Sequence, residues 1–202
     1  MEQFVVSARK YRPQAFEAVV GQSHITDTLL KSVANDHLAQ ALLFCGPRGV
    51  GKTTCARILS KVINGGADLT DEELALNIFE LDAASNNSVD DIRRLIDQVR
   101  FAPQTGKFKV YIIDEVHMLS QQAFNAFLKT LEEPPAHAIF ILATTEKHKI
   151  IPTILSRCQI FDFKRITVDD IAAHLAFVAQ KEGVTAEPEA LHMIAEKADG
   201  AL

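Results

Sequence analysis

Cysteine is scarce in this sequence, which has only Cys45, Cys55 and Cys158 among 202 residues. An odd number of cysteines spread this widely argues against a disulfide framework and indicates a reducing compartment. No segment approaches the roughly 18 uncharged residues that a membrane-spanning helix needs. Residues 1–12 also lack the apolar centre of a signal peptide. We therefore expect a soluble protein of the cytoplasm, with no membrane partner.

Positive charge is also in short supply. The 21 lysines and arginines are outnumbered by 26 aspartates and glutamates, which gives a formal net charge of -5. A protein that held nucleic acid by its overall charge would be basic. If this chain binds DNA, it does so through a local patch or within an assembly. Hydrophobic residues make up 48% of the sequence, enough for a core without a disulfide or a metal.

Short apolar runs alternate with helical patterns, which is typical of a parallel sheet flanked by helices. Strands are predicted at residues 41–45, 78–81, 109–114, 138–143 and 159–163. The run AIFILA at 138–143 is too apolar for any place but the middle of a sheet. Helices are expected to begin near Ser23, Ser88 and Ser120, each a candidate N-cap. The predicted fold class is α/β.

The pattern changes after Phe163, because only helical periodicity follows Thr167. We expect an α/β domain at 1–163 and a helical domain at 164–202. Two helices bury too little apolar surface to fold alone, and at roughly 150 residues per domain the length gives one domain and a fraction. We therefore expect the sequence to be part of a longer protein.

The strongest motif is GPRGVGKT at residues 46–53, the P-loop, which matches G-x-x-x-x-G-K-T in full. Its glycines let backbone N–H groups wrap around phosphate oxygens, and the helix that follows adds positive partial charge. Lys52 is predicted to reach the β- and γ-phosphates, and the Thr53 hydroxyl to ligate Mg²⁺. A structural glycine turn is the alternative. The predicted nucleotide-binding residues here are Gly46, Pro47, Arg48, Gly49, Val50, Gly51, Lys52, Thr53 and Thr54.

Two carboxylates, Asp114 and Glu115, follow the apolar run at 110–113. The carboxyl ends of strands are where α/β sheets bind ligands. We predict that Asp114 supports Mg²⁺, directly or through water, and that Glu115 orients and polarises an attacking water. An isolated pair of this kind is more often a solvated turn, but the upstream P-loop favours catalysis. The two motifs together predict hydrolysis of a nucleoside triphosphate.

Three further features leave alternatives open. Thr144 and Thr145 lie at the end of the strand predicted at 138–143. Their hydroxyls either bind the γ-phosphate or the attacking water, or cap the strand end. From its spacing alone, Arg157 is a surface charge or a partner of the helix dipole, with a catalytic role as the less favoured alternative. A basic stretch is either a DNA-facing edge or a solvated helix face; it comprises Arg93, Arg94, Arg100, Lys107 and Lys109.

Several segments together resemble the clamp-loader AAA+ ATPases, and within them the gamma/tau type of bacterial DNA polymerase III. They are SARKYRP (7–13), VVGQ (19–22), the P-loop, LDAAS (81–85), IDEVHML (113–119), LKTLEEPP (128–135) and ILSRC (154–158). The resemblance covers nearly the whole chain. It implies a RecA-type, five-stranded parallel sheet followed by a three-helix lid, of which this sequence holds the start.

The resemblance also implies roles for single residues. Lys52, Thr53, Asp114 and Glu115 keep the roles given above, and Thr145 takes the position that reads the γ-phosphate. Arg157 takes the position of an arginine finger that acts on ATP held by a neighbouring subunit. The residues that would close over adenine and ribose are Arg12, Pro13, Val19 and Val20.

The implied function is that of an ATPase motor that loads a ring-shaped sliding clamp onto primed DNA during replication. Its ligands would be ATP or ADP with Mg²⁺. Its partners would be the delta and delta-prime subunits, further gamma/tau copies, the beta clamp and primer–template DNA. It would act within the DNA polymerase III holoenzyme and have no polymerase site of its own.

Two departures from the family qualify this picture. Residues 64–77 contain no cysteine, although family members usually carry a four-cysteine zinc module there, so we expect no zinc. The family pattern continues past Leu202 into a sensor-2 arginine, and residues 1–202 alone are expected to hydrolyse ATP poorly and not to pentamerise well. The competing functions are a Holliday-junction branch-migration motor, a subunit that uses ATP only as a structural ligand, and a small-molecule P-loop kinase.

Overall fold

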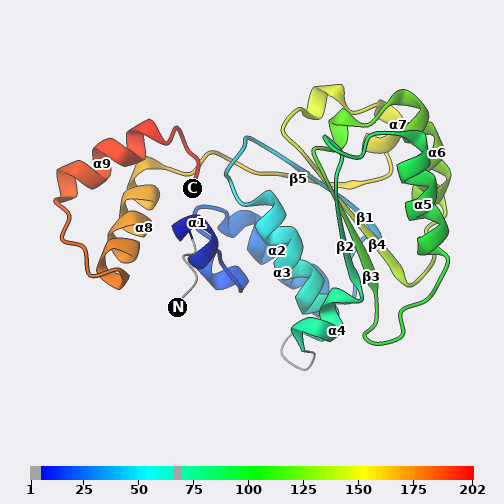
Figure 1. Ribbon diagram of the computed structural model, residues 1–202, viewed down its shortest axis with the longest axis horizontal. Coiled ribbons are helices and arrows are strands. Elements are labelled where there is room, and N and C mark those ends of the chain that lie inside the picture. Colours follow the sequence, from blue (N-terminus) through cyan, green and yellow to red (C-terminus); the bar gives the residue numbers. More distant parts are fainter. Residues whose placement is uncertain (1–5, 66–69) are drawn as a thin grey trace.

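The computed structural model describes residues 6–65 and 70–202. Its centre is a parallel sheet of five strands in the order β2-β3-β4-β1-β5 (Figure 1). The strands are β1 (Ala41–Cys45), β2 (Ile78–Asp82), β3 (Lys109–Asp114), β4 (Ala138–Thr144) and β5 (Gln159–Asp162). The predicted α/β class and parallel sheet are confirmed, and each bound lies within a residue of its predicted position.

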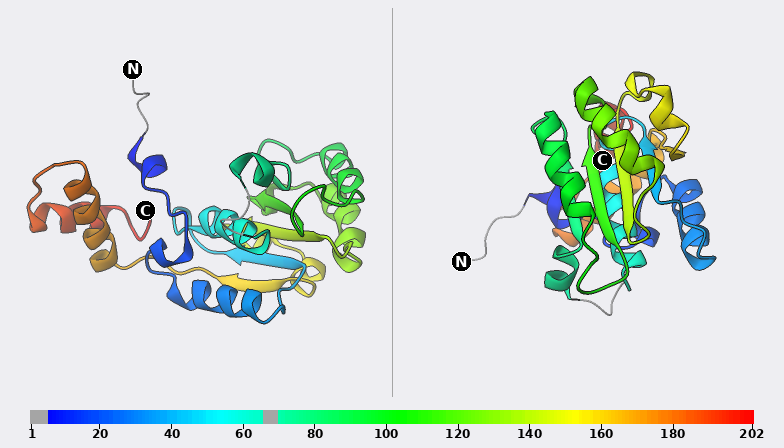
Figure 2. Two further views of the ribbon diagram at one scale, coloured as in Figure 1. Left: turned by 90° about the horizontal axis from the view of Figure 1, so that it is seen from below. Right: turned by 90° about the vertical axis from the view of Figure 1, so that its right-hand side faces the viewer.

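Helices cover both faces of this sheet, as the right-hand view of Figure 2 shows. The α-helices are α1 (Ser7–Lys10), α2 (Ser23–Ala34), α3 (Lys52–Ile63), α4 (Asp71–Ala75), α5 (Val89–Val99), α6 (Gln121–Glu132), α7 (Pro152–Leu155), α8 (Val168–Lys181) and α9 (Pro188–Lys197). Short 3-10 turns lie at Phe16–Ala18, Val116–Met118 and Lys147–Lys149. None of the described helices combines the length and the apolar character that crossing a bilayer requires.

Successive side chains of a strand point to opposite faces of the sheet, and here the side chains on both faces are apolar and covered by helices. In β1, Leu42 and Phe44 pack in the cluster that includes α2 and α3, whereas Leu43 and Cys45 pack in the cluster that includes α5 and α6. Strands buried on both faces must be apolar at every position. Every residue of β4, the central strand, is buried. A ligand can therefore approach the sheet only at the ends of its strands.

The last two helices stand at one end of the molecule, away from the sheet (Figure 1). Their small core contains Ile166, Ile171, Ala172 and Ala195. Several large apolar side chains on the pair remain exposed, among them Phe177, Met193 and Ile194. As the sequence predicted, the two helices bury little apolar surface.

The helix starts differ from the prediction at one place. Ser88 accepts from the backbone N–H of Asp91 in a capping box, and Ser120 accepts from that of Ala123, so these two caps are confirmed. The predicted cap at Ser23 is wrong, because α2 begins at Ser23 itself and has no side-chain cap. Gln22 takes the cap position, and its buried amide binds backbone groups of other segments instead.

Tyr111 offers a test of the core. Its ring stacks between Phe79 and Phe140, with centroid distances of 5.1 and 5.5 Å. In the described part of the chain its hydroxyl is buried without a hydrogen-bond partner, and burial raises its pKa to about 12. Because an unsatisfied buried hydroxyl costs about 1–3 kcal/mol, we expect Tyr111→Phe to raise the free energy of unfolding by about 1 kcal/mol.

Thermal and denaturant unfolding of the parent and variant proteins measure this difference. Tyr111→Leu serves as the control, because it removes the stacked ring together with the hydroxyl and should lower stability. A loss of stability in Tyr111→Phe would mean that the hydroxyl has a partner.

Candidate functional site

The P-loop leaves the end of β1 at the carboxyl edge of the sheet. Its glycines have positive φ angles of 150° at Gly46, 77° at Gly49 and 95° at Gly51. A Cβ atom at Gly46 would lie 2.6 Å from the Phe163 oxygen, and one at Gly49 would lie 2.6 Å from the Ala201 Cβ. Gly51 has open space around it, so there the backbone angle alone favours glycine.

The P-loop leads directly into the N-terminus of α3, which has 12 residues. Gly51 precedes the helix in the left-handed conformation, and no side chain in the described ranges caps it. The first N–H groups of a helix have no partner within the helix. This terminus therefore presents backbone donors and positive partial charge to an anion.

Lys52 lies across the P-loop. Its ammonium donates to the backbone oxygens of Gly46 at 2.7 Å and Pro47 at 2.6 Å, and the side chain is buried. Burial lowers the pKa of Lys52, whereas the carboxylates of Glu115 and Asp114 act in the opposite direction. The cation is thus held inside the loop with acidic groups nearby, a position suited to phosphate oxygens.

Thr53 and Asp114 join the two sequence motifs. The Thr53 Oγ1 donates to Asp114 Oδ2 at 2.7 Å, across from the first turn of α3 to the end of β3. Asp114 Oδ1 accepts from the backbone N–H of Glu115 at 2.9 Å. Hydroxyl and carboxylate oxygens are ligands that Mg²⁺ prefers. The two side chains therefore fit a magnesium ion.

Glu115 has a backbone φ of 47°, in the left-handed region that non-glycine residues rarely adopt. Its Oε2 accepts from the Thr145 hydroxyl at 3.0 Å and from the Thr145 backbone N–H at 3.4 Å. Strained backbone of this kind concentrates at functional sites. The structure thus brings together two residues that the sequence singled out separately.

His117 is a polar residue of this region to which the sequence prediction gave no role. Its side chain is 6% exposed and lies 3.4 Å from Glu115 Oε2 and 3.3 Å from Glu146 Oε1. The only sequence signal was its place in IDEVHML, two residues after Glu115.

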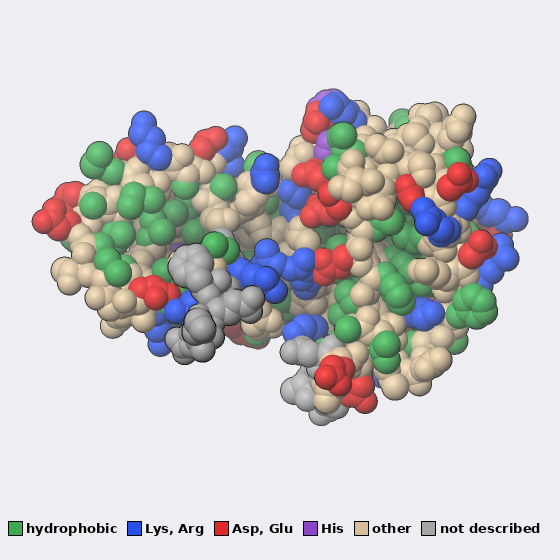
Figure 3. All heavy atoms as spheres, in the orientation of Figure 1, with side chains coloured by type: hydrophobic (Ala, Val, Ile, Leu, Met, Phe, Trp, Pro, Cys, Tyr) green, Lys and Arg blue, Asp and Glu red, His purple; other side chains and the backbone are tan. Residues whose placement is uncertain are grey.

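The predicted adenine-side residues divide into two groups. Arg12 and Pro13 line a cavity of about 260 Å³ together with Thr54. Val19 and Val20 do not line this cavity in the described structure, but pack on the α2–α3 and α8–α9 cores respectively. The remaining lining residues are Arg9, Gln14, Arg57, Ile58 and Lys61. Figure 3 shows Lys and Arg side chains gathered near the middle of this face, between the sheet and the α8–α9 pair.

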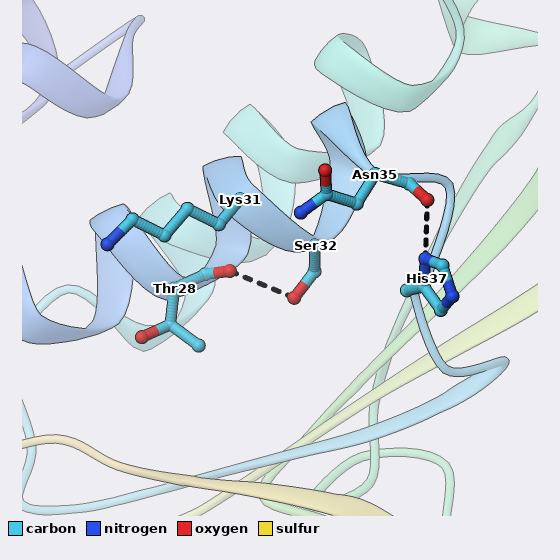
Figure 4. A pocket seen from close by; sticks show the side chains of 5 residues that line it. All are labelled: Thr28, Lys31, Ser32, Asn35 and His37. Carbon is cyan, nitrogen blue, oxygen red and sulfur yellow. Dashed lines mark hydrogen bonds between the residues drawn. The ribbon is translucent and has the colours of Figure 1, made fainter.

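A second, shallower cavity of about 390 Å³ lies along α2 (Figure 4). Its polar contacts are local, such as the bond from the Ser32 hydroxyl to the Thr28 backbone oxygen at 2.9 Å. None of the residues that the sequence singled out lines it. The other lining residues are Lys31, Asn35 and His37.

Arg157 lies at the N-terminal ends of the strands, whereas the P-loop lies at their C-terminal ends. Parallel pairing places Gln159 beside Leu42, at the N-terminal ends of β5 and β1, whereas the P-loop follows the C-terminal end of β1. The Arg157 guanidinium contacts Glu132 Oε1 at 2.5 Å and the Thr153 backbone oxygen at 2.6 Å. It is therefore separated from the P-loop of its own chain by the length of the sheet.

The three arginines of the basic stretch lie on or directly after α5, whereas Lys107 and Lys109 lie at the start of β3 or just before it. On α5, Arg93 contacts Asp90, Arg94 contacts Asp91 and Arg100 contacts Asp97, each three residues apart. Their positive charge is thereby offset locally.

The cysteines near the P-loop are packing residues. Both Cys45 and Cys55 are buried. Burial raises the pKa of their thiols, to about 11 in Cys45 and about 12 in Cys55. The segment 64–77, where the family's zinc module would lie, is described except for residues 66–69. In the described ranges, no group of histidine, cysteine and carboxylate side chains is arranged to hold a metal.

Comparison with known proteins places this site in context. Residues 21–167 match the family described as DNA polymerase III, delta subunit. The chain is 52% identical over 207 residues to DNA polymerase III subunit tau of Bacillus subtilis, covering 96% of this chain and 37% of that protein. It is 42% identical over 210 residues to DNA polymerase III subunit gamma of Buchnera aphidicola, covering 98% and 57%. It thus spans less than two thirds of either relative.

Among solved structures, the Holliday junction branch migration motor RuvB of Thermotoga maritima matches with a TM-score of 0.73 and 23% identity. The match covers 95% of this chain and 61% of that chain. The likeness shows that the five-stranded sheet and its helices share the fold of that motor, a parallel sheet flanked by helices, as expected from the sequence.

Proposed function

Since this chain belongs to the DNA polymerase III family of delta and tau/gamma subunits, we propose that it is an ATP hydrolase and a motor subunit of the clamp loader. One observation carries the proposal: the 2.7 Å bond between Thr53 and Asp114 brings the P-loop and the acidic strand end into one site. In this role, residues 1–163 form the ATPase domain and residues 164–202 the beginning of a helical lid.

The P-loop is proposed to bind the phosphates of ATP. Its backbone N–H groups and the N-terminus of α3 would hold phosphate oxygens, and Lys52 would neutralise the β- and γ-phosphates. Thr53 and Asp114 would hold Mg²⁺, which as a Lewis acid would withdraw charge from those oxygens. Arg12, Pro13, Val19 and Val20 are proposed to lie along adenine and ribose, with support from the cavity that joins Arg12 and Pro13 to Thr54.

Glu115 is proposed to orient the attacking water and to accept its proton. The water oxygen would bond to the γ-phosphorus as the bond between that phosphorus and the bridging oxygen of ADP breaks. Thr145, which donates to Glu115, would contact the γ-phosphate and place the carboxylate. Charge builds on the phosphoryl oxygens in the transition state, so a further cation accelerates the reaction. We propose that Arg157 of a neighbouring copy supplies it.

The proposed partners are delta, delta-prime and further gamma/tau subunits, the beta sliding clamp and primer–template DNA. ATP binding would order the contacts between subunits, and hydrolysis would release the clamp on DNA. The proposed location is the replication complex in the cytoplasm. Support for these partners comes from the family and from the proposed action of Arg157 on a neighbouring subunit's site, which would make hydrolysis depend on assembly.

The decisive experiment measures steady-state ATP hydrolysis by the full-length protein in complex with its partner subunits. We expect the clamp together with primed DNA to stimulate hydrolysis severalfold over either alone. Lys52→Ala is the control and should reduce the rate at least about 100-fold, since it removes a cation that stabilises the transition state. Indifference to the clamp would contradict the proposal, and stimulation by four-way junctions instead would favour a branch-migration motor.

A further inference from the structure

His117 lies between two carboxylates and a buried threonine at the carboxyl edge of the sheet. Its Nδ1 is 3.0 Å from Thr144 Oγ1 and 3.4 Å from Glu115 Oε2. On the other side of the ring, its Nε2 is 3.3 Å from Glu146 Oε1. Both ring nitrogens therefore have acidic or hydroxyl neighbours, and the side chain is only 6% exposed.

The groups around the ring are themselves fixed. Thr144 is the last residue of β4 and is fully buried, and its hydroxyl oxygen also accepts from the Glu146 backbone N–H at 3.0 Å. Glu146 is held by Lys149 at 2.8 Å. The ring of His117 thus contacts the end of β4 and the segment that follows it, and it lies beside the Glu115 carboxylate.

The Glu115 carboxylate is flanked by this ring and by Thr145, which donates to the same oxygen, Oε2. Glu115 also has a strained backbone, a feature that concentrates at functional sites. Thr145 directly follows β4, and His117 belongs to the 3-10 turn Val116–Met118, so groups from two segments lie against Oε2.

We propose that His117 is a positioning residue for Glu115. It ties the carboxylate to Thr144 and Glu146 and keeps it aimed at the place where the attacking water must lie. It does not itself touch the reacting atoms. This inference rests on the ATPase function proposed above. A water-orienting carboxylate acts only when its geometry is right, and a displacement of about 1 Å can cost about 100-fold in rate.

Three substitutions in the full-length protein, assembled with its partners, separate positioning from packing. His117→Phe keeps a ring of similar size without hydrogen-bonding groups. His117→Asn keeps a polar atom near the position of Nδ1, on the side of Thr144 and Glu115. His117→Gln places its amide near the position of Nε2, on the side of Glu146. His137→Phe is the matched control, because its ring is also hydrogen-bonded, to the Val99 backbone oxygen at 2.8 Å.

We expect His117→Phe to lower kcat about 10- to 100-fold with little change in the KM for ATP or in nucleotide affinity. His117→Asn should recover most of the lost kcat, His117→Gln should recover less, and His137→Phe should match the parent. In a Glu115→Gln background, His117→Phe should add little further loss, because both changes act on one group.

Thermal unfolding of every variant identifies loss of folding. A His117→Phe protein that folds and keeps the parent kcat would overturn the proposal, and so would an equal loss in His117→Phe and His117→Asn at unchanged stability. Should His117→Phe fail to fold, the His117→Asn and His117→Gln pair decides, since positioning requires different kcat values for the two. Absence of clamp-stimulated hydrolysis in the parent complex would instead contradict the proposed function itself.

Discussion

Arg157→Ala is expected to lower ATP hydrolysis by the assembled complex about 1,000-fold or more while each altered subunit still binds ATP. The reason is that an arginine finger stabilises transition-state charge and contributes roughly 10³- to 10⁵-fold to kcat. Arg157 lies at the edge of the sheet opposite its own P-loop, so the loss should fall on the neighbouring subunit's site. Rates per complex and nucleotide affinity measure the two effects.

Mixing two inactive proteins tests the trans action directly. Subunits with Arg157→Ala keep an intact P-loop, and subunits with Lys52→Ala keep an intact Arg157. If the arginine acts between chains, mixed assemblies contain composite sites and recover hydrolysis that neither protein has alone. No recovery in mixed assemblies of folded subunits would place the arginine's action within one chain. Arg93→Ala, on an arginine paired with Asp90 on α5, is the control and should leave the rate unchanged.

Glu115→Gln is expected to reduce kcat about 100- to 10,000-fold, the usual contribution of a positioned proton acceptor. The amide has the size of the carboxylate and its oxygen can still accept from Thr145, but it cannot polarise a water by accepting its proton. ATP affinity should therefore stay close to that of the parent. Single-turnover hydrolysis and equilibrium nucleotide binding separate the two quantities.

Glu133→Gln provides the matched control, since Glu133 is exposed at the end of α6. It should hydrolyse ATP at the parent rate. A Glu115→Gln complex that hydrolysed ATP as fast as the parent would favour ATP as a purely structural ligand.

The elements of the sheet were predictable because their apolar runs are continuous. Strands buried on both faces are continuous apolar runs of four to eight residues, a length typical of strands and too short for most helices. The prediction for 138–143 as the central strand is confirmed. The P-loop was predictable because its motif, G-x-x-x-x-G-K-T, has fixed residue types at fixed positions. The family resemblance read from LDAAS, LEEPP and SRC is likewise confirmed by the matches to tau and gamma subunits.

Contacts between the ends of different strands could not be predicted. The bond between Glu115 and Thr145 exists because β3 pairs with β4, and periodicity does not determine which strands are neighbours. His117 is not part of any motif whose spacing predicts a function. Its contacts with Thr144 and Glu146 also depend on the pairing of β3 with β4. Ser23 was assigned as a cap from residue type alone, although Gln22 occupies that position and binds the backbone of Lys164.

The placement of Arg157 and the P-loop on opposite edges of the sheet also restricts symmetry. A contact that brings one chain's arginine to another chain's P-loop, without the reverse contact in the same interface, joins two different surfaces and is therefore head-to-tail. Repeated, such contacts either close into a ring or continue as a helix. Any arc that stays open has two unlike ends, one with a P-loop that no arginine reaches and one with an arginine that has no nucleotide to act on. An open arc of such chains therefore always contains one fewer complete site than it has subunits.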